Sequence, residues 1–395
     1  MTTFSVTFLG CKVSHTDARA VRERMLAEGH SERVEGAAVA VVNTCCVTHE
    51  AVRKSRKAAA RAARSHERVY VTGCGANLAD AFSGLPANVV VVRRPSEETP
   101  DTVAGDVGAV GCVQAASRLD RVRAFVKIQD GCSFSCHFCV VPLVRGPSRS
   151  RAASAVLDEA HKRVAQGHRE LVLTGINLGC YRDRAAGYRL PRLIRELGAL
   201  PGLARLRLSS IEVNHVDTEL VAALRETPAV ARHLHVPLQS GDDGVLQAMA
   251  RRYRVATFMR RLEPLTDFNL TTDVIVGFPG EDELAFENTL RAVRDAEISK
   301  VHVFPYSPRP GTVTAERDSI PHAVKRDRSA RLRAASRDAC LARWRTKVGR
   351  DDLVLVDRPG RGYGDDYSPW LVDAPLGALV RVRGAEVTEE GVRAA

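Results

Sequence analysis

The sequence predicts an α/β protein with an N-terminal parallel-sheet domain, a central partial β/α barrel and a small C-terminal β-barrel. Short Val-rich strands alternate with helical patterns over the first hundred residues or so. About six further strand–helix units follow between Ala124 and Ile320, which suits a full or partial barrel. The last fifty residues or so contain short strands split by Gly-rich turns. The expected domains are residues 1–110, 120–342 and 343–395.

The N-terminal domain places a cysteine directly after each of its main strands. The expected elements are a helix at Thr16–Gly29 and strands at Phe4–Leu9, Val39–Val42 and Arg68–Thr72. The loops that follow these strands carry, in order, Cys11, then Cys45 with Cys46, then Cys74. Loops at the carboxyl ends of parallel strands gather at one edge of the sheet, where ligands bind. Three cysteines far apart in sequence are therefore expected to meet in space.

The remaining elements follow from composition and periodicity. Residues 94–120 show little periodicity and predict a linker. The central strands are expected at Phe125–Ile128, Glu170–Thr174, Arg205–Ser209, Leu234–Val236, Thr271–Val276 and Val301–Phe304. Amphipathic helices include Ala152–Gln166 and Glu283–Ala296, and a strongly basic helix spans about Ala323–Lys347. Tail strands are expected at Leu353–Val356, Gly360–Gly364 and Leu379–Val382, forming either an RNA-holding barrel or a structural cap.

The composition is that of an ordinary soluble chain with a basic surplus. Hydrophobic residues make up 45% and charged residues 27%, which excludes wholesale disorder, collagen and a disulfide-rich miniprotein. The net charge of +11 favours a polyanionic partner such as nucleic acid, with a solvated basic surface as the alternative. The start lacks a signal peptide pattern, and the apolar run at Val89–Val92 is far below the ~20 residues of a membrane span. We expect a cytoplasmic protein without membrane association, whose grouped cysteines serve metal or redox chemistry.

The sharpest chemical motif is the cysteine cluster at Cys132, Cys136 and Cys139, which has C-x3-C-x2-C spacing directly after a strand. Iron–sulfur clusters are held by thiolates, normally four for a four-iron cluster. Three close ligands leave one metal position open for a reactant. The alternative is a Cys3His zinc site with His137 as fourth ligand, which the adjacency of His137 to Cys136 disfavours.

This spacing resembles the radical S-adenosylmethionine superfamily. The resemblance implies that Cys132, Cys136 and Cys139 hold a [4Fe-4S] cluster whose open iron binds S-adenosylmethionine, which one electron cleaves to a 5′-deoxyadenosyl radical. It also implies an electron donor such as flavodoxin or ferredoxin. Polar residues at the ends of barrel strands usually face the site. The expected contacts to S-adenosylmethionine are Asn177, Glu212, Gln239 and Gly277. Beyond the cluster ligands, no catalytic acid or base is assigned.

The N-terminal cysteines resemble those of the methylthiotransferases within this superfamily. The matching motifs are Leu9–Lys12, Asn43–Cys45 and Thr72–Cys74. In that family the cysteines matching Cys11, Cys45 and Cys74 hold a second [4Fe-4S] cluster, whose open iron carries or relays the inserted sulfur. The alternative is three buried free cysteines. The family motif selects Cys45 rather than its neighbour Cys46, while the remaining cysteines, Cys112, Cys180 and Cys340, match no motif.

Within the methylthiotransferases the chain resembles the MtaB type. The similar stretches are Leu9–Val13, Asn43–Arg56, Phe125–Arg151, Leu173–Leu178 and His302–Gly311. The resemblance implies methylthiolation of N6-threonylcarbamoyladenosine on the 3′ side of the anticodon; the alternatives are isopentenyladenosine in tRNA and an aspartate of a ribosomal protein. Ser14 and Cys46 stand where Asn and Thr are common in the family. The C-terminal domain resembles the TRAM barrel but is short.

Basic residues near the cysteine loops fit a tRNA anticodon loop as the partner of a monomeric enzyme. Arg53, Lys57, Arg61 and Arg64 recur at helical spacing and are expected on one helix face. A second basic group, Arg145, Arg149 and Arg151, follows the cluster loop. We expect Arg53, Lys57, Arg145 and Arg149 to bind RNA phosphates, which position a nucleic acid without reading its sequence. The alternatives are solvated faces, and a non-catalytic zinc- and RNA-binding protein.

Overall fold

The structure of the chain, a computed structural model, describes residues 1–93, 95–108 and 122–395, which divide into two compact units. Unit 1 consists of the described part of the first 118 residues together with Asp130–Arg149 and Ser307–Glu316. Unit 2 contains the described residues up to Gln129 that precede this cysteine loop, then Ser150–Tyr306 and Arg317–Ala395. The loop with Cys132 thus belongs to the same compact unit as the N-terminal cysteines, whereas the predicted domain boundaries stay predictions.

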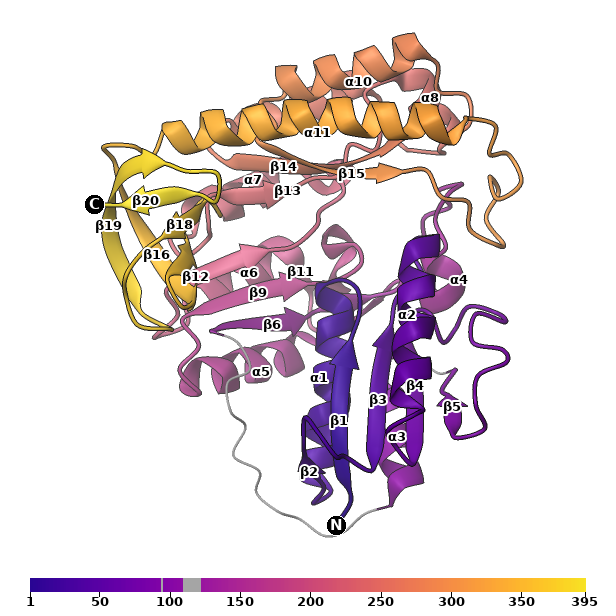
Figure 1. Cartoon of the computed structure of the whole chain (residues 1–395). Helices are drawn as coiled ribbons and strands as arrows, with labels where there is room; N and C mark the ends of the chain where they lie inside the picture. The colour runs from indigo at the N-terminus through magenta and orange to yellow at the C-terminus, as the bar shows by residue number, and fades with distance from the viewer. Residues whose placement is uncertain (94, 109–121) are drawn as a thin grey trace. The chain divides into compact units, whose positions relative to one another are not determined.

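Unit 1 contains a five-stranded sheet of order β2-β1-β3-β4-β5, in which every neighbouring pair is parallel (Figure 1). The strands are β1 (Thr3–Phe8), β2 (Ser31–Glu32), β3 (Val39–Thr44), β4 (Arg68–Gly73) and β5 (Val89–Val91). The helices are α1 (Lys12–Ala27), α2 (His49–Ala62), α3 (Thr99–Val107) and α4 (Val141–Arg145). The three predicted strands and the first predicted helix are confirmed.

The central strand β3 is buried along its whole length because helices cover both faces of the sheet. Val39 and Val41 pack in a core with Met25 of α1, while Ala40 and Val42 pack in another core with Ala59 of α2. Alternate residues of a strand point to opposite faces, which is why this run is apolar throughout rather than alternating.

The prediction of a linker over residues 94–120 is wrong for Thr99–Val107, which form α3. Pro100 lies in the first turn of this helix, where its missing N–H costs nothing. Val103 and Ala104 are buried in the core that contains α1 residues. Nine residues are too few to show a clear helical period, so tertiary packing decides this helix. Residues 94 and 109–121 lie outside the described part of the chain.

Unit 2 is built around six parallel strands that form a partial barrel. β12 (Arg205–Leu208), β9 (Glu170–Thr174) and β6 (Arg123–Lys127) pair in that order, and β13 (His233–His235), β14 (Asn269–Val276) and β15 (Lys300–Pro305) form the other half. Parallel bridges from Leu206 to Val230 and from Ser210 to His235 connect the halves. The barrel prediction is confirmed.

Helices follow the barrel strands and cover their outer side (Figure 1). They are α5 (Ala153–Ala165), α6 (Leu190–Gly198), α7 (Thr218–Glu226), α8 (Asp243–Ala248), α9 (Val255–Leu262), α10 (Glu283–Asp295) and the basic α11 (His322–Arg345). Short elements are β7 (Gln129–Asp130), β8 (Arg149–Ser150), β10 (Arg182–Asp183), β11 (Tyr188–Arg189) and the 3-10 turns Leu178–Cys180, Val213–His215 and Glu263–Leu265. None of the helices described is long and apolar enough to cross a membrane.

The C-terminal residues close into a five-stranded barrel of order β16-β17-β18-β20-β19. Its strands are β16 (Asp351–Arg358), β17 (Arg361–Tyr363), β18 (Pro369–Leu371), β19 (Leu379–Val387) and β20 (Val392–Ala394). Trp370 and Val354 fill its core. The predicted β-barrel is confirmed, and the sequence missed β18 and β20, which have only three residues each.

A buried ion network joins this small barrel to the partial barrel inside unit 2. Glu170 is fully buried and pairs with Arg205 and Arg207 at 3.2 and 3.1 Å. The same guanidinium groups donate hydrogen bonds to backbone carbonyls of the small barrel, including those of Leu353 and Gly364. The relative placement of the two barrels is therefore fixed by directional, charged contacts.

Candidate functional site

The three predicted N-terminal ligands lie at neighbouring strand ends in unit 1. Cys11 precedes α1 and is exposed, whereas Cys45 follows β3 and Cys74 follows β4, and both are buried. Burial, together with the negative charges of Cys74 and Cys11, raises the pKa of the Cys45 thiol to about 11. The Cys45 sulfur is thus close enough to both partners to feel their charge, as the edge-of-sheet argument predicts.

Cys46 also interacts with members of this N-terminal cysteine group. Its thiol donates a hydrogen bond to the Cys74 sulfur, and this bond together with burial raises the pKa of Cys46. For Cys74 the same bond, helped by the Arg145 guanidinium, outweighs burial and lowers the pKa to about 7. Charges on Cys74 and Cys45 act on Cys46, whereas Cys45 feels both Cys74 and Cys11. Both Cys45 and Cys46 thus interact with Cys74, and the choice of Cys45 as the third member of the trio stays a prediction.

The second cysteine group lies on an irregular loop of the same unit. Cys132, Cys136 and Cys139 are each partly buried. The Cys132 N–H donates to the carbonyl of Gly146 at 3.0 Å, which holds the start of the loop against its end. Gly131 has φ +66°, and a Cβ there would lie 2.0 Å from the Pro147 carbonyl oxygen. Only glycine fits this position, because its backbone is left-handed and the neighbouring segment of the chain lies too close for a side chain.

The donor set fits iron–sulfur clusters in both places. Thiolates in such sites accept N–H hydrogen bonds from the protein. Phe134 N–H donates to Cys132 Sγ at 3.4 Å, and Arg145 Nε donates to Cys74 Sγ at 2.9 Å. Val140, which follows Cys139 in the chain, belongs to the same apolar cluster as Cys74 within unit 1.

A segment distant in sequence supports both groups. Arg309 is buried and donates to the carbonyl oxygen of Cys46 at 3.3 Å. Thr314 donates through its hydroxyl and its N–H to the carbonyl of His137 in the loop, at 3.0 and 3.2 Å. Sequence reasoning missed these roles because backbone-directed contacts leave no spacing pattern.

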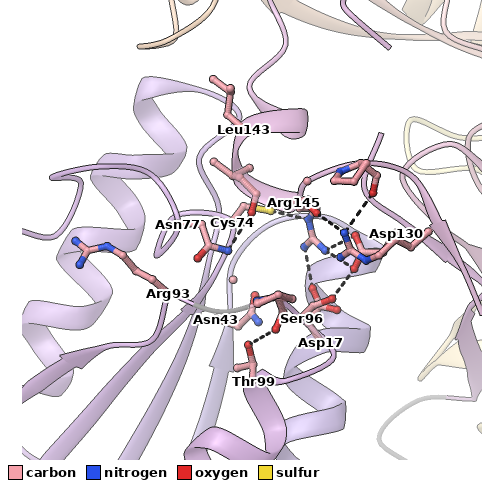
Figure 2. Close-up of a pocket in the computed structure, with 16 residues that line it drawn as sticks. Asp17, Asn43, Cys74, Asn77, Arg93, Ser96, Thr99, Asp130, Leu143 and Arg145 are labelled. Atoms are coloured by element: carbon pink, nitrogen blue, oxygen red, sulfur yellow. Dashed lines mark hydrogen bonds and ion pairs between the residues drawn. The ribbon is translucent and has the colours of Figure 1, made fainter. Parts of the chain in front are cut away.

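The structure corrects the prediction that Arg145 binds RNA. Its side chain is 4% exposed and contacts Cys74, Asp17 and Asp130. It lines a pocket of about 420 Å³ in unit 1, as do Asn43 and Cys74 (Figure 2). A buried guanidinium that is paired with these three residues cannot reach a phosphate backbone. The positive charge of Arg145 therefore serves contacts inside the protein.

The other predicted RNA contacts are more accessible. Lys57 and Arg53 are exposed on α2, on the same helix face as Arg61, and Arg53 makes an ion pair with Glu50 at 2.7 Å. Exposed pairs of this kind are weak and readily exchanged. Arg149 is partly buried and pairs with a glutamate at 2.9 Å. Because α2 ends at Ala62, Arg64 lies beyond the helix that carries Arg53, Lys57 and Arg61, and RNA contact stays a prediction.

Two of the residues expected to contact S-adenosylmethionine have unusual features within unit 2. Asn177 is buried after β9, and its Oδ1 has no hydrogen-bond partner among the described residues. Gln239 has φ +66°, a left-handed conformation that is uncommon outside glycine. The strand pairing holds it there, because its N–H donates to Asp273 O and its carbonyl accepts from Ile275 N–H. Such an imposed outlier points to function.

The other two residues have partners within unit 2. Glu212 makes a close ion pair with Arg251, yet burial still raises the pKa of Glu212. At Gly277, φ is +69°, and an added Cβ would lie 2.4 Å from the Lys325 side chain. The glycine is thus explained by packing, and its expected contact with a cofactor stays a prediction.

A polar cluster on β13, β14 and β15 was not predicted. His235, Asp273 and His302 have ligand-type atoms within 4.8 Å of one another. Asp273 and His302 are register partners on neighbouring strands, and His235 Nε2 lies 3.2 Å from Asp273 Oδ1. The apolar residues next to them along the strands belong to the main hydrophobic core of unit 2, and alternate residues of a strand point to opposite faces, so these three side chains share the other face of the sheet. Alternation along residues 271–276 is the signal that could have found them.

Comparisons with known proteins show which family the chain resembles. The model of the Radical SAM superfamily matches residues 126–293, and that of the Uncharacterized protein family UPF0004 matches residues 3–90. Threonylcarbamoyladenosine tRNA methylthiotransferase MtaB of Thermotoga maritima is 33% identical over 99% of this chain and 96% of its own length. The Bacillus subtilis protein of that name is 36% identical, covering 97% and 94%. A tRNA-2-methylthio-N(6)-dimethylallyladenosine synthase of Paracoccus denitrificans is 34% identical, covering 95% and 92%.

A solved structure shows a similar fold. The radical S-adenosylmethionine methyltransferase TsrM of Kitasatospora setae, determined with cobalamin and a [4Fe-4S] cluster bound, gives a TM-score of 0.59 at 14% identity. The match covers 80% of this chain and 77% of TsrM. At this identity the likeness concerns the fold alone.

Proposed function

The chain belongs to the radical S-adenosylmethionine methylthiotransferase family, and we propose that it converts N6-threonylcarbamoyladenosine beside the anticodon of tRNA to its 2-methylthio derivative. The observation that carries the proposal is that both cysteine trios belong to one compact unit. The near full-length similarity to relatives named MtaB supports the choice of substrate.

We assign the ligands by group. Cys132, Cys136 and Cys139 would hold one [4Fe-4S] cluster, and Cys11, Cys45 and Cys74 would hold the second. When bound, these clusters and S-adenosylmethionine would supply one-electron radical chemistry, and the second cluster would carry or relay the sulfur. C2 of adenine has no acidic proton and no leaving group, so acid–base catalysis alone offers no route to substitution there.

The protein's own contribution is binding and orientation. The Oδ1 of Asn177, which has no hydrogen-bond partner in the described ranges, would accept a hydrogen bond from S-adenosylmethionine, and the fixed backbone of Gln239 would present its side chain to the same ligand. Glu212, paired with Arg251, and Gly277 complete the proposed binding set. Lys57, Arg53 and the partly exposed Arg149 would contact RNA phosphates.

The expected setting is cytoplasmic. We propose that the enzyme acts as a monomer and takes electrons from a donor such as flavodoxin or ferredoxin. The substrate is an unpaired anticodon loop, whose modified base can be splayed out of the stack. Protein side chains recognise RNA mainly in such single-stranded regions.

Nucleoside mass spectrometry of tRNA with and without the gene tests the function. Loss of 2-methylthio-threonylcarbamoyladenosine alone is expected. If 2-methylthio-N6-dimethylallyladenosine is lost instead, the enzyme would act on the substrate named for the Paracoccus relative. Unchanged methylthioadenosines would overturn a tRNA substrate and favour a ribosomal-protein aspartate.

Two cysteine variants test the division of labour in the purified, anaerobically reconstituted enzyme. Cys132→Ala should abolish cleavage of S-adenosylmethionine. Cys11→Ala should retain cleavage and lose sulfur insertion. Thiolation by the Cys11 variant contradicts the two-cluster assignment, and absence of broad visible absorption after reconstitution would indicate a zinc protein.

A further inference from the structure

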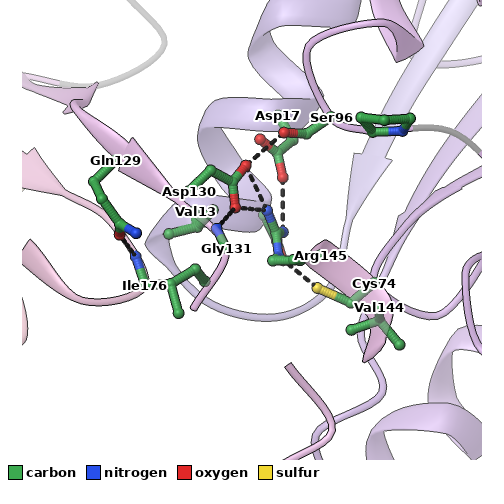
Figure 3. Close-up of polar contacts among 12 residues, drawn as sticks. Val13, Asp17, Cys74, Ser96, Gln129, Asp130, Gly131, Val144, Arg145 and Ile176 are labelled. Carbon is green, nitrogen blue, oxygen red and sulfur yellow. Dashed lines mark hydrogen bonds and ion pairs between the residues drawn. The ribbon is translucent and has the colours of Figure 1, made fainter. Parts of the chain in front are cut away.

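One buried guanidinium contacts three separate parts of unit 1 (Figure 3). Arg145 donates from Nε to Cys74 Sγ at 2.9 Å. Its Nη1 donates to both oxygens of Asp130 at 2.9 and 3.1 Å, and its Nη2 donates to Asp17 at 2.8 Å. Each nitrogen of the planar group therefore has its own acceptor, which is a geometry that lysine cannot reproduce.

The two carboxylates hold the guanidinium in place. Asp130 is itself fixed, because it accepts from the Gly131 N–H at 2.8 Å and from the Ser96 hydroxyl. The carboxylates of Asp17 and Asp130 supply the counter-charge that this buried guanidinium requires. The cation therefore stays charged in a buried site, where an unpaired charge would be costly.

The position of Arg145 connects the two cysteine groups. Asp130 lies two residues before Cys132, at the entrance to the cluster loop, and Arg145 lies six residues after Cys139, at the end of α4. Its Nε points away from both carboxylates to the Cys74 sulfur, as Figure 3 shows. Hydrogen bonds and charge at ligand sulfurs set the reduction potential of iron–sulfur clusters.

We propose that Arg145 is a positioning residue that donates a charge-assisted hydrogen bond to the Cys74 ligand and thereby raises the reduction potential of the second cluster. This inference rests on the proposed function, which makes Cys74 a ligand of that cluster. The reduced cluster carries one more negative charge, so a nearby cation and N–H donor stabilise it more than the oxidised form. Asp130 ties the same cation to the first cluster loop.

The test measures the potential of the second cluster alone. In full-length protein with Cys132, Cys136 and Cys139 replaced by Ala, the remaining cluster is titrated anaerobically and followed by electron paramagnetic resonance. Arg145→Gln should lower the equilibrium constant for reduction at least tenfold, which is 59 mV for one electron. Asp17→Asn should shift the potential the other way, because it removes a buried negative charge and leaves the bond to Cys74.

Controls separate this role from a structural one. Arg93→Gln removes an exposed guanidinium from the lining of the same pocket and should leave the potential unchanged. If Arg145→Gln does not fold, Arg145→Lys, which keeps the charge without the three-way geometry, should show an intermediate negative shift. An unchanged potential in the Arg145 variants, or equal-sign shifts in the Arg145 and Asp17 variants, overturns the inference. A parent protein that binds no iron would instead overturn the assignment of Cys74 as a ligand.

Discussion

Glu170→Gln tests whether the buried ion network holds the two barrels of unit 2 together. Glu170 is fully buried, and its carboxylate accepts from Arg207 Nε at 3.1 Å and from Arg205 Nη1 at 3.2 Å. Glutamine keeps the volume and one acceptor but removes the charge. Both guanidinium groups, and that of Arg123 at 3.9 Å, would then lack their shared counter-charge.

The expected cost follows from what the substitution leaves behind. Removing one partner of a buried ion pair destabilises a protein by about 3–5 kcal/mol, because the remaining charge stays buried. Carbonyl contacts of Arg205 and Arg207 to the small barrel moderate this loss, so we expect about 3 kcal/mol in the free energy of unfolding. For a unit of about 250 residues, roughly 2 °C per kcal/mol gives a melting temperature about 6 °C lower.

Intrinsic fluorescence is a selective assay. The chain has two tryptophans, Trp344 at the end of α11 and Trp370 in the small barrel, and both pack in the same apolar core. The matched control is Glu219→Gln, which breaks a 2.6 Å ion pair with Arg189 between half-exposed side chains and should cost under about 1 kcal/mol. Equal melting temperatures for the two variants would refute the reasoning.

Three further outcomes are expected. Burial raises the pKa of Glu170, but the charges of the arginines outweigh it and lower the pKa overall. The ionised carboxylate therefore contributes its full stabilisation of the fold above pH 4.5, and this stabilisation is lost as the pH falls through the lowered pKa. In denaturation curves, the difference in unfolding free energy between wild type and Glu170→Gln should narrow below pH 4.5, and a constant difference contradicts this. Gly131→Ala forces a Cβ to 2.0 Å from the Pro147 carbonyl oxygen, and we expect it to remove about half of the iron bound per protein. The control Gly36→Ala has the same φ but open space around the added Cβ, and it should retain the iron. Lys57→Glu should weaken tRNA binding and reduce the slope of log K against log salt by about one; an unchanged slope would place this face away from RNA.

Local patterns in the sequence were sufficient for the main architecture. Val-rich strands followed by cysteines predicted both the parallel sheet and the meeting of Cys11, Cys45 and Cys74 at its edge. Strand–helix spacing predicted the partial barrel, and Gly-rich turns predicted the small barrel. These features repeat over many residues and report periodicity, which a single sequence contains.

Short elements, and features that exist only through tertiary contacts, could not be predicted from the sequence pattern. The helix α3 has only nine residues, and it forms because Val103 packs against a neighbouring helix. The cluster of His235, Asp273 and His302 exists only through strand register. Arg309 acts on a backbone carbonyl 263 positions away, a contact that no spacing announces.

The sequence by itself determined the class of fold, the two cysteine trios and the chemistry that thiolates at those spacings support. Tertiary structure alone decided what each arginine does: Arg145 lies buried on a thiolate, while Lys57 and its neighbours remain in solvent. The physical reason is that a charge carries the same signature in sequence whether water or a buried carboxylate solvates it, and only packing decides between the two.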